Sequence, residues 1–339
     1  MMRYKRYIIV IGLLIGIIFT SHGQDIHFSK FYSAPMILNP ANTTNYHGNW
    51  NVITNYRKQN LGSISHYITS IGAFDMPVYI KKRRAGLGVI WVNDKSSDNT
   101  FSVNKLFLSS AYFVRLSNKM YLHMGMQVGY VHKQLDQTVL SFPEQFDMTS
   151  GSFNSNLANH ENFSDYTFSY LDLNWGLIWS YKFEQFYSET GFSMFHANRP
   201  KESFFDNAEY MNPRYVGHIY LNKLLTTHFY VKPKVLYVFQ GKASEFLAGS
   251  HLGVTISNTE YINDFNVGVY FRGGLNRNPN ALIFTTGIGY SNFDISLSYD
   301  LDYLGGEYNL GATNSFEISI AFKRPVTDIK EKSIPCTLF

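Results

Sequence analysis

The chain has 339 residues, of which 17% are aromatic and 16% are charged, and it contains one cysteine. A single cysteine excludes a framework of internal disulfides. The formal net charge of +4 is too small for the broad basic surface by which proteins bind nucleic acid, so we expect no nucleic-acid partner.

The first residues predict export from the cytoplasm. Three basic residues among the first six precede an uncharged stretch, residues 7–19, and small residues follow at Ser21 and Gly23. These are the three regions of a secretory signal peptide. A transmembrane anchor is the alternative, but it needs about 20 apolar residues. We therefore predict a signal peptide over residues 1–23 and a mature chain that begins near Gln24.

Loss of that segment removes three basic residues and no acidic ones, so the balance falls from 29 against 25 to 26 against 25. The mature chain is nearly neutral and has no further apolar run of membrane-helix length. Aromatic residues and the 25 glycines are abundant. With an export signal, this composition favours an outer-membrane β-barrel, in which apolar residues are spread over alternating positions. A secreted β-sandwich is the alternative.

Residues 24–49 precede the first predicted strand, and we expect an N-terminal arm in the periplasm or a plug that folds into the barrel. Beyond them, apolar and polar residues alternate, as in FDISLSYD (residues 293–300) and FEISIAFK (residues 316–323). This period of two is typical of strands with one apolar face. Many runs reach about nine to eleven residues, the length with which a tilted strand crosses a bilayer, whereas sandwich strands average about 5–6 residues.

The alternation predicts fourteen strands in a transmembrane antiparallel barrel over residues 50–324, followed by a periplasmic C-terminal tail over residues 325–339. An even number of strands suits a bacterial single-chain barrel. The expected strands cover residues 50–58, 63–75, 84–94, 102–116, 119–132, 166–181, 186–196, 213–222, 226–239, 244–256, 259–272, 281–291, 293–301 and 313–323.

The lengths of the connections predict which end of the barrel faces which compartment. Every even-numbered connection is short, and the longest ones are odd, near residues 133–165, 197–212 and 302–312, although two odd connections are also short. Outer-membrane barrels have short turns in the periplasm and longer loops outside. Within the ninth strand, Pro233 cannot donate a ladder hydrogen bond and predicts a bulge or a strand end.

Residues that could carry chemistry do not form a recognisable motif. His160-Glu161 has no second histidine four residues along, so the pattern of a zinc protease is missing. Gly86-x-Gly88 and Gly287-x-Gly289 read as small strand residues beneath neighbouring aromatic side chains. Ser193 with His196, and His27 with Ser29, could be hydrolase pairs only if geometry joined them. We predict no catalytic residue, no cofactor and no metal site.

Charged residues have two interpretations each. The basic run of residues 81–84 at the second connection is expected to be a solvated turn at the membrane boundary, and the alternative is a docking patch or a contact with anionic headgroups. Four carboxylates fall on predicted inward positions, where they would line a wet lumen or pair with lysine and arginine. They are Asp172, Asp294, Asp300 and Glu317.

A series of short motifs runs along the mature chain, beginning with QDIHFSKFYSAPMILNPA, residues 24–41. The motif positions are Gln24-Asp25, Phe28, Phe31, Leu38 to Ala41 with Asn39 and Pro40, Asn55 to Arg57, Leu87-Gly88, Leu140 to Asp147, the strand end with His196, Arg199 and Pro200, Gly289 to Asp300, Phe316 to Ile320 and Pro335-Cys336. Through the order and spacing of these motifs, rather than one of them alone, the chain resembles the PorP/SprF family of type IX secretion membrane proteins of Bacteroidetes. The resemblance covers essentially the whole mature chain.

The resemblance implies a component of the type IX secretion system in the cell outer membrane. It implies that the protein assists secretion or surface anchoring of a cargo protein, such as a gliding adhesin, through the cargo's C-terminal sorting domain. Periplasmic and lipoprotein components of the apparatus, and the outer-membrane lipids, are the further implied partners. The residues alone leave two alternatives: a passive porin or hydrophobic-substrate channel, and an outer-membrane hydrolase.

Overall fold

The computed structural model describes residues 28–59, 61, 66–81, 83–96, 100–136, 143–148, 151–154, 157, 167–202, 210–256, 262–274, 281–302 and 314–325. Within these ranges, no helix has the length and apolar character needed to cross a membrane. The predicted signal peptide and residues 326–339 of the predicted tail lie outside the described ranges.

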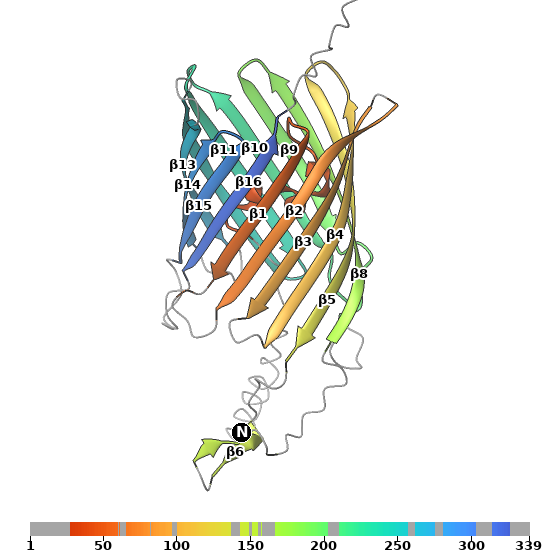
Figure 1. Cartoon of the computed structure of the whole chain (residues 1–339), viewed down its shortest axis with the longest axis vertical. Helices are drawn as coiled ribbons and strands as arrows, with labels where there is room; N and C mark the ends of the chain where they lie inside the picture. The colour runs from red at the N-terminus through yellow and green to blue at the C-terminus, as the bar shows by residue number, and fades with distance from the viewer. Residues whose placement is uncertain are drawn as a thin grey trace, which may run out of the picture.

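Fourteen antiparallel strands close into a barrel (Figure 1). β1 pairs with β16 to complete the ring, with Tyr56 opposite Ile318. Closure gives every strand two neighbours, which a sheet in a bilayer needs because lipid offers no hydrogen-bond partner to a free edge. The strands are β1 (Trp50–Gln59), β2 (Tyr67–Ile80), β3 (Arg83–Ser96), β4 (Phe101–Arg115), β5 (Met120–Leu135), β8 (Thr167–Phe183), β9 (Phe186–Phe195), β10 (Arg214–Leu224), β11 (Phe229–Gln240), β12 (Ala243–Thr255), β13 (Ile262–Gly273), β14 (Ala281–Tyr290), β15 (Phe293–Asp302) and β16 (Ser315–Arg324).

The structure confirms the all-β class, the antiparallel barrel and the number of strands that the alternation predicts. The expected connection of residues 133–165 also contains a 3-10 turn, η4 (Pro143–Gln145), and a two-stranded hairpin of β6 (Phe146–Asp147) and β7 (Ser152–Phe153). The prediction for Pro233 is wrong in detail. Strand β11 continues through it in constant register with β12, and only the ladder to β10 is interrupted there.

The two faces of the sheet have opposite chemistry. Outward side chains such as Leu108, Met126 and Leu171 are 61–67% exposed, and these large apolar groups face the region that lipid occupies. Their neighbours Ser109 and Gln127 point inward and are buried. This arrangement is the inverse of that in a soluble domain, and it requires the interior polar groups to find partners inside the barrel.

Two ends of the barrel are distinguished by their connections. The short-turn end carries the β2–β3, β4–β5, β8–β9, β10–β11, β12–β13 and β14–β15 connections, the start of β1 and the end of β16; the long-loop end carries the others. In outer-membrane barrels the first of these faces the periplasm. The wall is uneven, because β4, β5 and β8 have 15, 16 and 17 residues and β14, β15 and β16 have 10 each.

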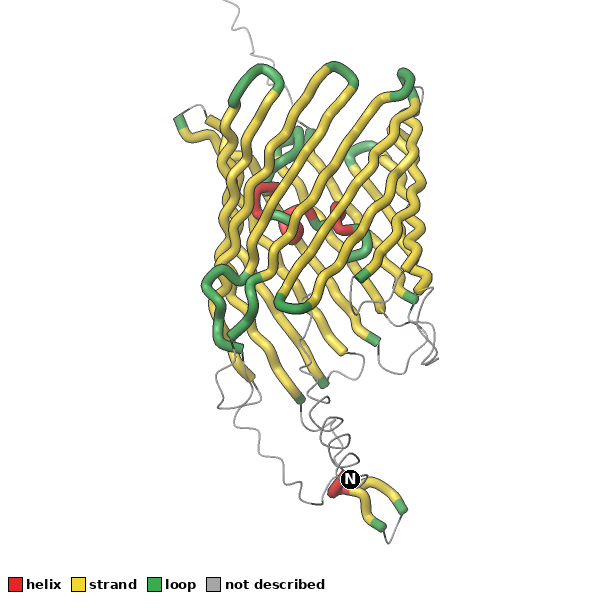
Figure 2. Tube along the Cα trace, turned by 180° about the vertical axis from the view of Figure 1, so that it is seen from behind, coloured by secondary structure: helices red, strands yellow, loops and turns green. Residues whose placement is uncertain are grey.

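Residues 28–49, here called the inner segment, lie inside the barrel, where Figure 2 shows their short helices surrounded by strands. They form η1 (Phe31–Ser33), α2 (Pro35–Leu38) and η2 (Pro40–Asn42). Twelve of the first seventeen of these residues are buried. The segment therefore provides an interior core for strands whose inward faces are largely polar.

Glycines in the wall make room for this segment. A Cβ atom at Gly125 would lie 2.2 Å from the backbone nitrogen of Ala41, and one at Gly86 would lie 2.3 Å from the Thr44 hydroxyl oxygen. At Gly86 and Gly88 the covering groups are Thr44 and Met36, not the aromatic side chains expected from the sequence. The glycines of β3 and β5 thus lie where the inner segment contacts the wall.

We expect Gly125→Ala to destabilise the barrel by about 1–3 kcal/mol, because the new methyl group meets backbone atoms of the inner segment that cannot turn aside. The matched control is Gly217→Ala, whose Cβ would have no neighbour within 4 Å. Thermal unfolding in detergent, followed by gel mobility of heated and unheated samples, should show a lowered Tm for the first variant alone. Equal Tm values would contradict the proposed contact.

Candidate functional site

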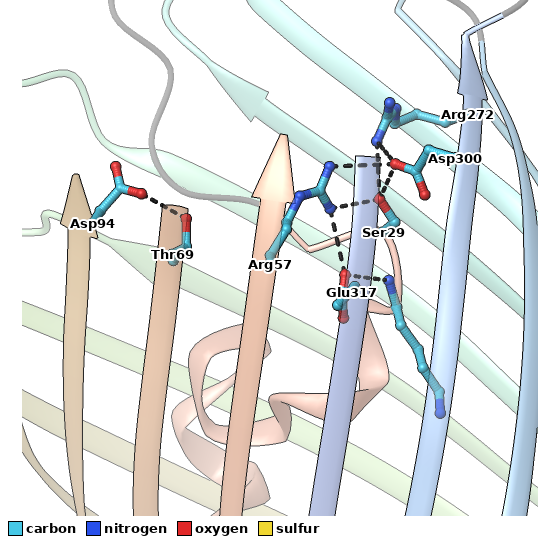
Figure 3. A network of polar contacts seen from close by, with 8 residues as sticks. Ser29, Arg57, Thr69, Asp94, Arg272, Asp300 and Glu317 are labelled. Atoms are coloured by element: carbon cyan, nitrogen blue, oxygen red, sulfur yellow. Dashed lines mark hydrogen bonds and ion pairs between the residues drawn. The ribbon is translucent and has the colours of Figure 1, made fainter. Parts of the chain in front are cut away.

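A buried ionic cluster fastens the inner segment at the long-loop end (Figure 3). The Arg57 guanidinium donates to the Ser29 hydroxyl at 2.5 Å, and it lies 3.3 Å from Asp300 and 3.5 Å from Glu317. Ser29 donates in turn to Asp300, and Arg272 reaches the same carboxylate oxygen at 3.0 Å. Two guanidinium groups thus face two carboxylates, and each of these four side chains is no more than 6% exposed.

Burial makes this cluster sensitive to the loss of any member. A charged pair removed from water is stable only when both charges are matched and hydrogen-bonded, and loss of one partner leaves the other uncompensated. The backbone nitrogen of Lys30 also donates to Glu317, at 3.4 Å. The cluster therefore joins β1, β13, β15 and β16 to the start of the inner segment.

The middle of the inner segment is clamped by amide side chains. Asn39 is fully buried; its side-chain amide donates to the carbonyls of Leu177 at 3.1 Å and Phe192 at 3.2 Å, and its side-chain oxygen accepts from the Ala41 nitrogen at 2.9 Å. From the wall, Gln127 donates to the Met36 carbonyl at 3.1 Å. Asn39 uses both ends of its amide, so a side chain without that geometry would leave buried backbone groups unpaired.

At the short-turn end, Asp75 and Arg84 hold the last residues of the inner segment. Asp75 accepts from the Thr44 nitrogen at 2.6 Å, and Arg84 donates to the carbonyls of Thr44 at 2.8 Å and Tyr46 at 2.6 Å. Arg84 also lies over the ring of Phe113. The basic run is therefore only partly a solvated turn, because Arg83 is exposed whereas Arg84 serves as an internal fastener.

The strand end at His196 folds over the long-loop rim. His196 and Arg199 have positive φ values of 57° and 45°, which L-residues adopt only where neighbouring contacts compensate the strain. His196 pairs with Asp172 through Nδ1 at 2.9 Å and donates its backbone nitrogen to the Asn174 side chain at 2.9 Å. The buried Pro200 accepts at its carbonyl from the Met211 nitrogen, at 3.0 Å.

The same rim turn covers part of the β8 edge. The β8–β9 ladder ends at Trp175, so the outer half of β8 extends beyond β9. Asn198 accepts from the Leu173 nitrogen at 3.0 Å and donates to the Leu171 carbonyl at 2.7 Å, while the Ala197 nitrogen donates to the Leu173 carbonyl. The turn thereby continues the sheet where a strand is missing and blunts an edge that could otherwise pair with another chain.

The six positions singled out by the family pattern occupy three places along the lumen. Asn39 and Pro40 lie in the middle, Arg57 lies in the long-loop cluster, and the three residues of the His196 turn lie at the rim. The sequence reasoning did not identify the other side chains that fasten the inner segment. These side chains are Ser29, Asp75, Arg84, Gln127 and Arg272.

The inward carboxylates have the partners that a closed interior demands. Asp300 and Glu317 pair with Arg57, as the sequence suggested, but Asp172 pairs with a histidine. Asp294 pairs with Lys323 at 2.8 Å, and its side chain is 59% exposed at the short-turn mouth. Three of the four are therefore structural charges inside the barrel rather than wall groups of an open channel.

The candidate hydrolase pairs have no catalytic geometry in the described residues. The Ser193 hydroxyl donates to the Leu38 carbonyl at 2.8 Å. A serine nucleophile would instead donate to its histidine base, here His196. The cavity beside His196 and Asp172 has a volume of about 20 Å³, room for about one water molecule. His27 lies outside the described ranges. Within these ranges, no group of three histidine, cysteine, aspartate or glutamate residues is placed to hold a metal ion.

Several solved structures share the barrel fold of this chain. A deletion mutant of the TodX monoaromatic hydrocarbon channel is similar over 86% of this chain and 94% of its own, with 8% identity and a TM-score of 0.52. A FadL homologue of Pseudomonas aeruginosa is similar over 84% and 92%, with 8% identity and a TM-score of 0.51. The Ralstonia pickettii toluene transporter TbuX is similar over 87% and 94%, with 10% identity and a TM-score of 0.50.

These likenesses establish the fold of an outer-membrane barrel, and identities this low establish nothing more. The comparison with curated proteins gives no match. One family model, described as type IX secretion system membrane protein PorP/SprF, matches residues 20–322. The barrel, its fastened inner segment and this match over most of its length together identify the chain as a member of the PorP/SprF family of type IX secretion membrane proteins.

Proposed function

We propose that this protein assists the secretion or surface anchoring of a secreted surface protein, such as a gliding adhesin, by receiving its C-terminal sorting domain. Family membership over residues 20–322 carries the proposal. The interior supports it, because a segment fastened at both ends and in the middle suits a rigid platform better than an open conduit. A rigid scaffold that presents long loops at one rim is a common way to build a binding surface.

We assign the cargo contact to the long-loop end and the apparatus contact to the short-turn end. The loops of residues 133–165 and 197–212 leave the rim that outer-membrane barrels expose to the outside. The second of these begins at the His196 turn, which is held to β8 by its contacts with Asp172 and Leu173. Periplasmic and lipoprotein components would dock on the short turns, and outer-membrane lipids would surround the apolar wall.

An affinity pull-down of the tagged protein from gently solubilised outer membranes tests the proposal. We expect a secreted surface protein with a C-terminal sorting domain to follow it, together with components of the type IX apparatus. The same membranes carrying an unrelated tagged barrel provide the control. A barrel that comes down without cargo, even after crosslinking, would contradict the proposed role.

Deletion of residues 140–160 should spare folding and abolish retention of the cargo at the cell surface. The deleted stretch lies between β5 and β8, so the ladder of these two strands keeps its residues. Surface labelling of the cargo provides the measurement, and the amount of heat-modifiable barrel in the membrane reports folding. Deletion of residues 275–280, in the shorter β13–β14 connection, is the control. Normal cargo retention in the 140–160 deletion would exclude this loop as the contact.

A passive channel for hydrophobic substrates is the second candidate, because solved structures with this fold include monoaromatic hydrocarbon channels. The two functions differ in conductance. With the inner segment in place, we expect the purified barrel to be nearly silent in planar bilayers. Open, stable conductance of the unmodified protein would favour the channel.

Arg57→Ala should release the start of the inner segment and raise conductance above that of the parent. The variant leaves Asp300 and Glu317 buried with one cation fewer, a loss of about 3–5 kcal/mol for a buried pair. Arg83→Ala is the matched control, because Arg83 is exposed and donates to the Tyr112 hydroxyl at the short-turn end. Equal conductance in both variants would show that the cluster does not hold the lumen closed.

We propose no catalytic activity for the chain. The Ser193 hydroxyl is engaged by the inner segment, and the cavity at His196 has no room for a substrate. We further propose that residues 1–23 are a signal peptide, since export to the outer membrane requires such a segment.

A further inference from the structure

A cavity of about 410 Å³ lies inside the barrel between the inner segment and strands β9 to β16, β1 and β2. Most of its strand residues belong to the half of the barrel nearer the short turns. At the mouth, the side chains of Lys323 and Asp294 are 42% and 59% exposed, so solvent reaches the cavity from that end. Phe31, which lines the cavity, belongs to a buried hydrophobic cluster that also contains Leu236 and Ile283.

In the wall of this cavity, the carboxylates have hydrogen-bond or ion-pair partners, whereas most of the lysines form no ion pair in the described residues. The wall contains four carboxylates, and each has a partner: Asp75 binds the Thr44 nitrogen, Glu189 lies 3.5 Å from His218, Asp264 accepts from Tyr230 at 2.5 Å, and Asp294 pairs with Lys323. The wall also contains four lysines, and of these only Lys323 is paired with a carboxylate in the described part of the chain. The other three are Lys30, Lys232 and Lys234.

These three lysines contact aromatic rings in place of anions. The Lys234 ammonium nitrogen lies 3.0 Å from the centre of the Tyr32 ring, and the Lys30 nitrogen lies 5.2 Å from the same ring. The Lys232 nitrogen lies 3.9 Å from the centre of the Tyr230 ring. The Lys234 residue is 6% exposed, so its charge is almost completely removed from bulk water. A ring quadrupole compensates an ammonium group less completely than a carboxylate does.

The Tyr32 ring contacts two of these lysines, Lys30 and Lys234, and is itself fixed in position. Its hydroxyl lies 2.6 Å from Nε2 of His251, and Nδ1 of His251 lies 2.5 Å from the Tyr270 hydroxyl, so the ring cannot turn freely. Lys30, on the inner segment, has a pKa lowered to about 8, first because of burial and despite the attraction of Glu317. An anion beside Lys30 would stabilise its charged form and raise that pKa.

We propose that this cavity binds a phosphate group that enters from the short-turn mouth and is held by Lys30, Lys232 and Lys234. None of these three lysines lies within ion-pair distance of a carboxylate in the described residues. An anion with more than one negative charge, such as a phosphate monoester or pyrophosphate, can therefore contact all three better than a single carboxylate can. Lysine binds phosphate as a point charge, so no bidentate geometry is needed. The site goes beyond the proposed role in secretion and does not depend on it.

Two sources share this chemistry, and the ligands used in the test separate them. A soluble phosphorylated compound would enter from the periplasm, and a lipid headgroup would enter from the inner rim of the bilayer. Calorimetric titration of the purified full chain, in a detergent without phosphate, should use pyrophosphate for the first source and short-chain phosphatidic acid for the second. Saturable binding of either ligand, with a rise in Tm relative to chloride at equal ionic strength, is the expected result.

Lys234→Met should weaken the binding by about tenfold or more, which corresponds to the loss of one contact with a charged partner. It keeps an unbranched apolar stem in the cavity. Lys232→Met, at a less buried position, is the second variant in case the first does not fold. Lys242→Met is the matched control, because Lys242 is exposed in the β11–β12 turn at the opposite end of the barrel.

Binding by the parent and by Lys242→Met, with loss in Lys232→Met or Lys234→Met, would support the site. Binding of neither pyrophosphate nor short-chain phosphatidic acid by the parent would overturn it. Undiminished binding in a folded Lys232→Met or Lys234→Met variant, or equal weakening in Lys242→Met, would overturn it as well. None of these outcomes depends on cargo capture, so failure here and failure of the secretion proposal are distinguishable.

Discussion

The buried Arg57 guanidinium is the interaction on which the arrangement of the interior depends. It lies where β1, β15 and β16 meet the start of the inner segment, and it contacts Ser29, Asp300 and Glu317 at once. Because these groups are withdrawn from water, each requires the others to remain matched in charge. The residue therefore does more than pair with one acid: it couples closure of the barrel at β1 and β16 to the position of the segment inside.

Closure of the sheet creates the need for that segment. A barrel of fourteen strands with lipid outside must turn its polar side chains inward, and these side chains then require partners. The inner segment supplies backbone groups to Gln127, Ser193, Asp75 and Arg84. Its own Asn39 side chain donates to backbone carbonyls of the wall. Glycines at the contact positions let two backbones approach closely. The fold is thus a sheet closed around a polypeptide core, with a solvent-accessible cavity beside that core at the short-turn end.

The alternation of residues was sufficient to predict the strands, because one face meets lipid and the other does not, and this contrast recurs in every strand. It was also sufficient to place Asp300 and Glu317 inward. It could not predict which cation each acid meets. Arg57 lies far from both acids in sequence, and only the closure of β1 on β16 brings it to them, whereas Arg272 reaches Asp300 across β14. The path of residues 28–49 inside the barrel could not be predicted either, because helices of three or four residues are too short to show a repeating pattern of apolar residues. The pattern of glycines in β3 and β5 was the one available signal, and its meaning becomes clear only when the covering residues are known.

The two halves of the interior are built on different electrostatic principles. At the long-loop end, two guanidinium groups and two carboxylates form a compact neutral cluster that seals the chain in place. At the short-turn end, the carboxylates are satisfied by hydrogen bonds, by a histidine and by the one lysine at the mouth, which leaves three lysines against tyrosine rings. Burial of an ammonium group is costly without an anion, so a sequence selected for stability alone would favour apolar side chains at such positions. Retention of three lysines around one cavity is the arrangement expected of a site that is completed by a charge from outside the chain, and the cavity opens at the short-turn end of the barrel.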